Sequence, residues 1–564
     1  MSGRRMSGWL LGLSMVATTF AADTPGLVTE LVRTKGVSGN WAWWAFLLTG
    51  MLTVFLYARL WRRSGVRTDL EFYELRYSGR PAVVLRVFRA LYLGVVFNVI
   101  VMAVVSVAAI KLGQVLLGAS PATVLICGGV TTLVLSAFGG FRAVVLTDCL
   151  LFGVAMTGAI AAAYFALQHP SVGGLSGLFS HDSVAAKQAL TPAWDWSSTE
   201  SRDLLATTLL VPLTVQWWSV WYPGAEPGGG GYLAQRMLAA KNEDHAFGAV
   251  MLFNVAHYAL RPWPWILVAL ASIVVYPELA DLRAAFPAVD ESKLGHDLAY
   301  PAMLTMAPIG WRGLIIASLL SAYVSTISTH LNWGASYVTG DFYQRVVDPA
   351  ASPQRLVMVG RISTVVMMLL ASLLALWLQT AKQGFDLLLS VGAGTDLIYI
   401  LRWYWWRVNA FAEIVAMAAS VVVAAYLQFG PDHGLAGWQA LCLGVAVTTA
   451  IWFSAIWLSP PERPATLEAF CRQVRPSGPG WRRVYREAAR RGDMLDGPKD
   501  GESIRIGLLR MALGCVAIYS LLFAVGKFLY GEPLQCGLLA LTSVVSTAAL
   551  AATYWRAPPT PRAA

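Results

Sequence analysis

The sequence predicts an all-α polytopic membrane protein with a five-plus-five inverted-repeat core and additional C-terminal helices. Three observations support this fold class. The 564 residues are 57% hydrophobic and only 13% charged, with a mean hydropathy of +0.57, which excludes a water-soluble globular protein of this size. About fourteen apolar segments are long enough to cross a bilayer. The first and the sixth segments are both interrupted by proline, glycine and polar residues.

The apolar segments define the expected domain organisation. We expect spans at 8–32, 40–61, 84–116, 121–138, 142–167, 204–223, 246–275, 305–340, 357–380, 384–402, 408–429, 437–458, 504–529 and 533–555. These give a short N-terminal segment (1–7), a first repeat of five spans (8–167), a loop (168–203), a second repeat (204–405), two accessory spans (406–458), an arginine-rich loop (459–505) and two C-terminal spans with a tail (506–564).

The distribution of basic residues predicts the orientation in the membrane. The loops 62–83 and 459–505 are rich in arginine, whereas the loops 168–203 and 276–304 on the other side hold few basic residues. Basic residues concentrate in cytoplasmic loops, so we expect both termini in the cytoplasm of a cell whose plasma membrane holds the protein. The net charge of +10 therefore reports topology, and no nucleic-acid partner is expected.

The first span carries Asp23, Thr24, Pro25 and Gly26 in its middle. A carboxylate is costly inside a membrane and proline removes a backbone donor, so we expect the helix to open around 21–24 and expose carbonyl groups to a cation. Two alternatives remain open. Residues 1–22 also resemble a signal peptide cleaved after Ala22, and Pro25 could kink a continuous helix in which a neighbour satisfies Asp23.

The sixth span ends in a similar interruption, PGAEPGGGG at 223–231. An odd number of spans per repeat gives the two halves opposite orientations, so a second broken helix at this position fits inverted repeats. The alternative is that this segment is an ordinary loop after the span. The polar and aromatic residues beside it are candidates for a solute pocket and gate, with membrane-interface anchoring as the alternative: Gln216, Trp217, Trp218, Trp221 and Tyr222.

The eighth span presents small and hydroxyl-bearing residues at helical spacing. Ala322, Ser325, Thr326 and Thr329 follow the i, i+3, i+4, i+7 pattern of one helix face. Two adjacent hydroxyls opposite the carbonyls of an opened helix supply the hard oxygen ligands that sodium prefers. The alternative is that these hydroxyls bond the carbonyls of their own helix or let neighbouring helices approach closely.

Several motifs together resemble the sodium:solute symporter family, which includes the sodium/proline and sodium/galactose symporters. They are GWLLGLSMVATTFAADTPG, DLEFYELRYSGRP, GGFRAVVLTD, YLAQRMLAAK and AYVSTISTHLN followed by GDFYQ, in this order over residues 8–405. The resemblance implies a LeuT-type core with a sodium site between the first and eighth spans. Carried over by motif, the sodium ligands are the carbonyls of Ala21, Thr24 and Ala322 and the hydroxyls of Ser325 and Thr326.

The resemblance also implies roles for two carboxylates and leaves the solute open. Asp23 and Asp148 match acidic residues of the family's motifs and are expected on the ion path. The positions where the sugar symporters carry sugar-contacting groups fall near Trp43 and Phe46, so sugar specificity does not transfer. The family normally has one further span before the first core helix, which residues 1–7 do not supply.

Counting from the QRMLAAK motif, the sugar symporter's contacting lysine falls near His257, with Arg261 one turn further on. A cation buried in the membrane requires a counter-ion. Arg261 could therefore contact an anionic or carboxylated solute, or pair with Asp386 or Asp396. His257 is either a pocket residue or a packing histidine.

The function predicted is sodium-coupled symport of a small organic solute by alternating access. Sodium is the coupling ion and the only metal expected, and no cofactor is implied. A proton-coupled carrier using Asp23 is the alternative, followed by a membrane sensor or channel. The sequence contains no phosphate loop, nucleophile elbow or metal motif, so an enzyme is not expected. The partners are the solute, sodium and the lipid bilayer, and the oligomeric state is not predicted.

Overall fold

The computed structural model describes residues 5–66, 68–138, 141–219, 228–431, 433–498 and 502–555. Within these ranges the regular elements are helices, and one isolated β-bridge joins Met6 to Ala240. The α-helices of the first half are α1 (Gly8–Thr18), α2 (Thr24–Lys35), α3 (Trp41–Trp44), α4 (Leu47–Leu52), α5 (Ala58–Ser64), α6 (Glu71–Arg76), α7 (Gly79–Leu91), α8 (Asn98–Leu117), α9 (Pro121–Phe138), α10 (Phe141–Leu167), α11 (Gly174–Ser180), α12 (Asp182–Ala185) and α13 (Thr199–Leu205).

The second half continues with further α-helices, and π-helical and 3₁₀ segments occur in both halves. The α-helices are α14 (Gly231–Ala239), α15 (Glu243–Val255), α16 (Pro262–Val275), α17 (Leu279–Ala285), α18 (Ala299–Leu304), α19 (Ile309–Ser336), α20 (Pro353–Trp377), α21 (Ala381–Tyr404), α22 (Ala410–Phe429), α23 (Gly437–Leu458), α24 (Pro464–Val474), α25 (Arg482–Arg490), α26 (Ile504–Leu529) and α27 (Pro533–Trp555). The π-helical segments are η3 (Thr53–Tyr57), η4 (Tyr92–Phe97), η5 (Ala206–Leu210), η6 (Pro212–Gln216), η7 (Ala256–Leu260) and η10 (Tyr337–Val347). The 3₁₀ segments are η2 (Val37–Asn40), η8 (Glu291–Lys293), η9 (His296–Leu298) and η11 (Pro479–Trp481).

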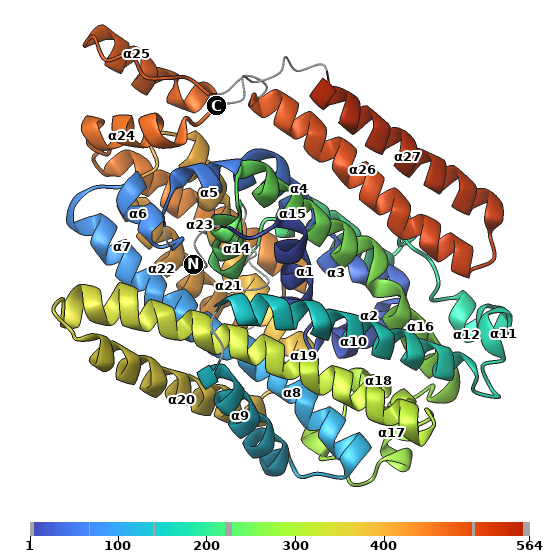
Figure 1. Cartoon of the computed structure of the whole chain (residues 1–564). Coiled ribbons are helices and arrows are strands. Elements are labelled where there is room, and N and C mark those ends of the chain that lie inside the picture. Colours follow the sequence, from blue (N-terminus) through green and yellow to red (C-terminus); the bar gives the residue numbers. More distant parts are fainter. Residues whose placement is uncertain are drawn as a thin grey trace.

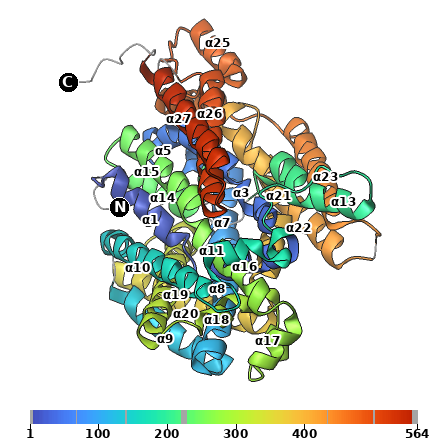
Figure 2. The ribbon, with the colours of Figure 1, turned by 90° about the vertical axis from the view of Figure 1, so that its right-hand side faces the viewer.

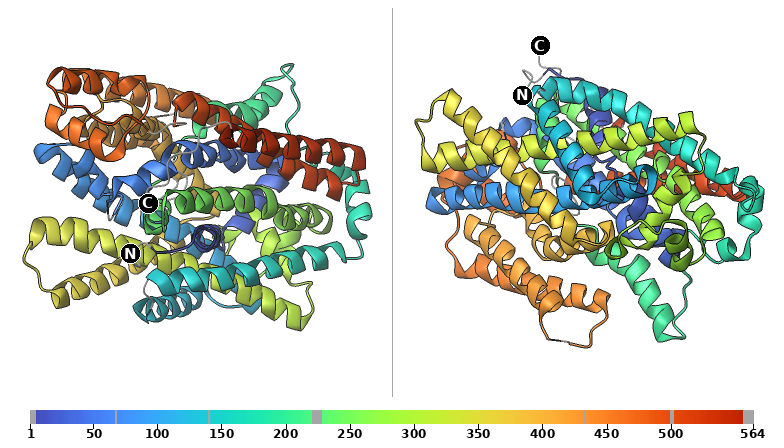
Figure 3. Two further views of the ribbon diagram at one scale, coloured as in Figure 1. Left: turned by 45° about the horizontal axis from the view of Figure 1, so that its top comes forward. Right: turned by 90° about the horizontal axis from the view of Figure 1, so that it is seen from below.

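The long helices form one bundle around α1, which packs against α10 and α15 (Figure 1). The α26–α27 hairpin runs along one flank of this bundle (Figure 3), and α24 and α25 lie together at one end of it. On another flank α13 lies beside α23 (Figure 2), where the Trp438 indole donates a hydrogen bond to Asp203 at 2.8 Å. The α26–α27 hairpin and α23 therefore lie on the flanks of the bundle.

Ten helices of the described chain are long and apolar enough to cross a membrane. The four other expected spans correspond to the two interrupted helices, to α9, and to α21, which carries charged residues along its length. The outer face of α27 supports a membrane environment, because Leu534, Leu538, Leu541 and Val544 are each more than half exposed in the isolated chain. The all-helical membrane fold predicted from the sequence is confirmed.

The first interruption, at residues 19–23, begins two residues earlier than the opening expected at 21–24. Helix α1 ends at Thr18, and α2 begins at Thr24 with Pro25 in its first turn. Pro25 itself lies inside α2, because the first turn of a helix accommodates a proline, whose missing N–H needs no partner there. The helix ends where Thr18 and Thr19 bond back to the carbonyls of Ser14 and Val16 at 2.8 and 2.9 Å.

Helix α1 packs unusually closely on α15. A Cβ atom at Gly8 or Gly12 would lie 2.6 or 2.8 Å from the backbone carbonyl oxygens of His245 or Ala249. These two glycines are four residues apart and face α15 together, which is the small-residue spacing that lets membrane helices approach each other. The first half of the broken helix is therefore held to the seventh span by backbone contact.

The second interruption lies between η6 and α14, and residues 220–227 within it are outside the described residues. Gly228 and Gly229 adopt φ angles of 85° and 84°, which a residue with a Cβ adopts only with strain. The Trp61 indole donates to the Gly228 carbonyl at 2.5 Å, and the Gly231 N–H donates to the Asp69 carboxylate at 2.7 Å. The glycine run thus shapes the start of α14.

Removing the Asp69 carboxylate should destabilise this second half-helix. Asp69 accepts the Gly231 N–H and also the hydroxyl of Tyr337. Asp69→Ala leaves a buried N–H without its acceptor, so we expect a loss of about 1–3 kcal/mol in a thermal unfolding measurement in detergent. Asp69→Asn keeps one acceptor oxygen and should lose less. An alanine variant as stable as the native protein would contradict this role.

Candidate sodium and solute site

A buried carboxylate organises the space between α1, α10 and α19. Asp148 Oδ2 accepts the Ser14 hydroxyl at 2.6 Å, and Asp148 Oδ1 accepts the Ser325 hydroxyl at 2.8 Å. Ser14 and Ser325 come from the two helices that the sequence predicts to hold sodium, and Asp148 is 1% exposed. Because the Ser325 hydroxyl donates a hydrogen bond to Asp148, the lone pairs of its oxygen are directed elsewhere.

Arg236 on α14 supplies the positive charge beside Asp148. Its Nη2 lies 3.4 Å from Asp148 Oδ2 and donates to Thr18 Oγ1 at 2.9 Å, while its Nε donates to Ser14 Oγ at 3.0 Å. Both members of the ion pair are almost completely buried, with side-chain exposures of 1% and 2%. An arginine and an aspartate that satisfy each other within hydrogen-bonded helices avoid the cost of an isolated buried charge.

The hydroxyl face of α19 meets the end of α1. Thr326 Oγ1 donates to the Thr18 carbonyl over 3.5 Å, and Ala322, Ser325 and Thr326 are all buried. Backbone carbonyl and hydroxyl oxygens therefore face each other across this contact, which is a donor set suited to a hard monovalent cation. The Thr18 carbonyl was not among the ligands that the sequence suggested.

A cavity of about 40 Å³ lies at the break between α1 and α2. Ala21 and Thr24 both line it, as does Asp23 between them. The remaining walls come from α2, α3, α8, η7, the residue before α16, and α21: Thr19, Leu27, Trp43, Val101, Val104, His257, Arg261, Phe385 and Leu388. The structure therefore brings Asp23, His257 and Arg261 together in one central cavity.

Three polar side chains of this cavity form a closed triangle. Arg261 Nη1 donates to Thr19 Oγ1 at 3.1 Å, Arg261 Nη2 lies 3.4 Å from His257 Nε2, and His257 Nδ1 lies 3.1 Å from Thr19 Oγ1. A guanidinium only donates hydrogen bonds, so His257 Nε2 is the acceptor of the Arg261 N–H. The proton of the neutral imidazole is therefore on Nδ1, and this N–H donates a hydrogen bond to Thr19 Oγ1. In this arrangement His257 is neutral and positions the Arg261 guanidinium. Asp386, one expected partner of Arg261, instead bonds Lys382.

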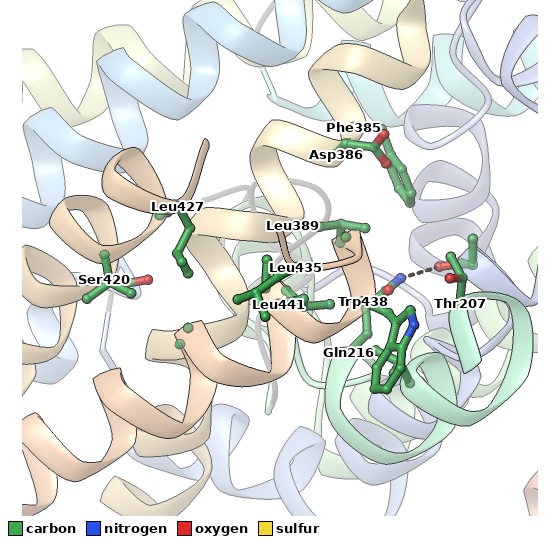
Figure 4. Close-up of a pocket in the computed structure, with 18 of the residues that line it drawn as sticks. Thr207, Gln216, Phe385, Asp386, Leu389, Ser420, Leu427, Leu435, Trp438 and Leu441 are labelled. Atoms are coloured by element: carbon green, nitrogen blue, oxygen red, sulfur yellow. Dashed lines mark hydrogen bonds between the residues drawn. The ribbon is translucent and has the colours of Figure 1, made fainter. Parts of the chain in front are cut away.

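A second, larger cavity of about 540 Å³ lies beside the second broken helix (Figure 4). Gln216 lines it and donates to the Ala42 carbonyl at 2.8 Å. The walls combine α21, α22, α23 and η5, as Leu389, Ser420, Trp438 and Thr207 show in Figure 4. Phe385 lines both cavities and is 7% exposed, so its ring stands between them.

Trp217 and Trp218, near the second break, form hydrogen bonds with neighbouring helices. The Trp218 indole donates to the Ala393 carbonyl at 3.2 Å, and the Trp217 carbonyl accepts the Thr49 hydroxyl. These contacts tie the first half of the broken helix to α4 and α21. Trp221 and Tyr222 lie outside the described residues.

Sequence reasoning missed Ser14, Thr18, Thr19 and Arg236. The sequence contains evidence for part of this set. The arginine in the apolar surroundings of YLAQRMLAAK requires a counter-ion, and Asp148 is a carboxylate in another span without an assigned partner. The threonine pair at the end of α1 also marks the end of a helix. Which of these groups meet depends on how the helices cross, and no local pattern contains that information.

Comparisons with known proteins agree with this architecture. The model of the sodium:solute symporter family matches residues 1–420. The sodium/glucose cotransporter of Vibrio parahaemolyticus is 26% identical over 447 residues, covering 76% of this chain and 79% of the relative. The sodium/sialic acid symporter of Proteus mirabilis (strain HI4320) is 22% identical over 475 residues, covering 81% and 90%.

A solved structure of a Na⁺-coupled sialic acid symporter, in its substrate-bound outward-open state, has a TM-score of 0.59 and 19% identity, and the match covers 82% of this chain and 92% of that chain. This likeness shows the LeuT-type fold. The chain belongs to the sodium:solute symporter family and is an integral membrane transporter that carries a small solute together with sodium by alternating access.

Proposed function

We propose that sodium binds between the end of α1 and the hydroxyl face of α19, and that the solute binds in the central cavity that the residues of the break line. The observation that carries this proposal is the approach of Thr326 Oγ1 to the Thr18 carbonyl at 3.5 Å. A cation that enters this contact replaces one weak hydrogen bond with several oxygen ligands.

The proposed sodium ligands are the carbonyls of Thr18, Ala21 and Ala322 and the hydroxyls of Ser325 and Thr326. The set differs from the family-based expectation in Thr24, which is the first residue of α2, so that its carbonyl can accept the N–H of the residue four positions further along that helix. Asp148 is not one of these ligands but supports one of them. It orients the Ser325 hydroxyl and, with Arg236 beside it, adds less than a full negative charge to the site.

Two neighbouring residues link the ion to the solute. Thr18 contacts α19 and Arg236, whereas Thr19, the next residue, contacts His257 and Arg261 in the central cavity. A rearrangement at the end of α1 therefore changes both sites together. Sodium shifts the conformational equilibrium only as far as it binds one state more tightly, and this shared helix end provides the differential contact.

Phe385 acts as the barrier between the central cavity and the larger cavity. The rim of the larger cavity includes the exposed side chains of Asp386, His433 and Leu435, which gives a path to water. With both termini in the cytoplasm, as the arginine-rich loops favour, this rim faces the outside of the plasma membrane. The larger cavity is then the outer vestibule for a solute on its way to the central cavity.

Phe385→Ala should join the two cavities. The reporter is Val104→Cys, on the α8 wall of the central cavity, in a background without the native cysteines. We expect this thiol to react several-fold faster with a membrane-impermeant maleimide added from outside when Phe385→Ala is also present than in the parent. Leu388→Ala is the matched control, because Leu388 lines only the central cavity. Equal labelling rates in the Phe385 variant and the parent would contradict the barrier.

Uptake into proteoliposomes tests the coupling. We expect accumulation of a radiolabelled solute when a sodium gradient is imposed, and no accumulation when a proton gradient is imposed in potassium buffer. Accumulation driven by protons alone would contradict sodium binding between α1 and α19 and would favour Asp23 as a proton carrier.

A further inference from the structure

The central cavity contains two opposite charges on different helices. Asp23 comes from the break between α1 and α2, and Arg261 comes from the junction of η7 and α16. Asp23 occupies the position before α2 without capping that helix, and its Oδ1 is buried and accepts no hydrogen bond from the described residues. A buried acceptor that the fold leaves unsatisfied costs stability, which a ligand with a suitable donor recovers.

Arg261 is held rigidly on the opposite wall. Its terminal nitrogens bond Thr19 and His257, and its guanidinium lies over the rings of Phe20 and Trp265 at 5.7 and 5.1 Å from their centroids. A guanidinium fixed in this way has little conformational freedom left to lose when it binds a planar anion. Carboxylate is the anionic group that fits this geometry best.

Apart from Thr19, Thr24 and His257, the rest of the cavity lining is mostly apolar. Leu27 from α2, Val101 and Val104 from α8, and Leu388 from α21 supply hydrocarbon surface between the charged ends. A polyhydroxylated solute would leave hydroxyl groups against these side chains, and each buried hydroxyl without a hydrogen-bond partner would weaken binding. A small aliphatic body fits these walls without that cost.

We propose that the transported solute is a small zwitterion, whose ammonium group binds Asp23, whose carboxylate binds Arg261 and whose aliphatic body packs against Val101, Val104 and Leu388. This inference rests on the proposed function, because it requires the central cavity to be the solute site. The solute has no net charge, so the two charges of the cavity are balanced both with and without it. Each transport cycle then moves only the charge of the sodium.

The first test is thermal stabilisation of the purified full-length protein in sodium and in potassium. The zwitterionic probes are glycine, L-alanine, β-alanine and 4-aminobutyrate, which differ in the separation of their two charges. The controls are propionate, propylamine, D-glucose and N-acetylneuraminate, which lack one charge or carry several hydroxyls. We expect stabilisation by at least one zwitterion in sodium and by none of the four controls.

Two outcomes would overturn the solute class. One is stabilisation by D-glucose or N-acetylneuraminate, and the other is a protein that responds to sodium but to none of the zwitterions. Neither of these two outcomes contradicts the proposed sodium site. A protein that does not respond to sodium would instead count against the proposed function, so the two failures are distinguishable.

The second test is Asp23→Asn, which removes the charge that the ammonium group requires and keeps the size of the side chain. We expect the affinity for the best zwitterion to fall at least tenfold and the affinity for propionate to rise. Glu30→Gln is the matched control, because Glu30 is a carboxylate of α2 outside the cavity lining. Equal zwitterion affinity in the native protein and Asp23→Asn would overturn the assignment, and retained sodium stabilisation shows that the variant is folded.

Discussion

Replacing Ser325 and Thr326 together with alanine is expected to raise the sodium concentration for half-maximal binding by about a hundred-fold or more. Loss of a group that merely supports a metal ligand costs roughly 10–100-fold in affinity, and this variant removes two proposed ligands. The Asp148 carboxylate also loses the Ser325 donor, 2.8 Å away. Sodium titration of thermal stability measures the change without knowledge of the solute.

The matched control for this double variant is Ser328→Ala. Ser328 lies on the same helix and donates its hydroxyl to the Ser325 carbonyl at 3.1 Å within α19, so its removal tests a hydroxyl loss outside the proposed ligand set. We expect nearly native sodium affinity in this control. Unchanged sodium affinity in the Ser325→Ala, Thr326→Ala double variant would remove α19 from the sodium site.

Breaking the Asp148–Arg236 pair should strongly destabilise the core. Asp148→Leu or Arg236→Met alone leaves one buried charge without its partner, which costs about 3–5 kcal/mol of folding stability. The double variant removes both charges, so we expect it to be more stable than either single variant. Thermal unfolding of the four proteins of this double-mutant cycle in detergent measures the coupling.

The same cycle separates stability from ion binding. Even where the double variant recovers stability, Ser325 has lost the carboxylate that orients it, so sodium affinity should remain low. The exposed pair Arg483–Glu487 on α25 is a control that should change stability little, because surface ion pairs are weak. Additive effects of Asp148→Leu and Arg236→Met would show that the two groups act independently.

The sequence predicts the fold class because its strongest signals are local. Pro25, Asp23 and the glycine run before α14 mark the two interruptions, and the helical spacing of Ala322, Ser325 and Thr326 marks the face that meets α1. These features require only composition and periodicity. The end of α1 at Thr18 was harder to predict, because it depends on side chains that bond back to their own helix.

The parts of the site that the sequence did not reveal depend on helix crossing. His257 and Arg261 are one turn apart, so their common face is visible in the sequence. Their shared partner Thr19 lies on a distant segment, and the π-helical segment η7 that carries His257 has no clear sequence signature. The same holds for Phe385, whose position between two cavities follows only from the packing of α21.

The most direct test of the account is the thermal stability of the purified native protein in sodium against potassium at equal ionic strength. Sodium that binds only the folded protein should stabilise it by about 1.4 kcal/mol at ten times its dissociation constant. We expect this stabilisation in the native protein and its loss in the Ser325→Ala, Thr326→Ala double variant. Equal stability of the native protein in sodium and in potassium over the whole titration would contradict a sodium site between α1 and α19.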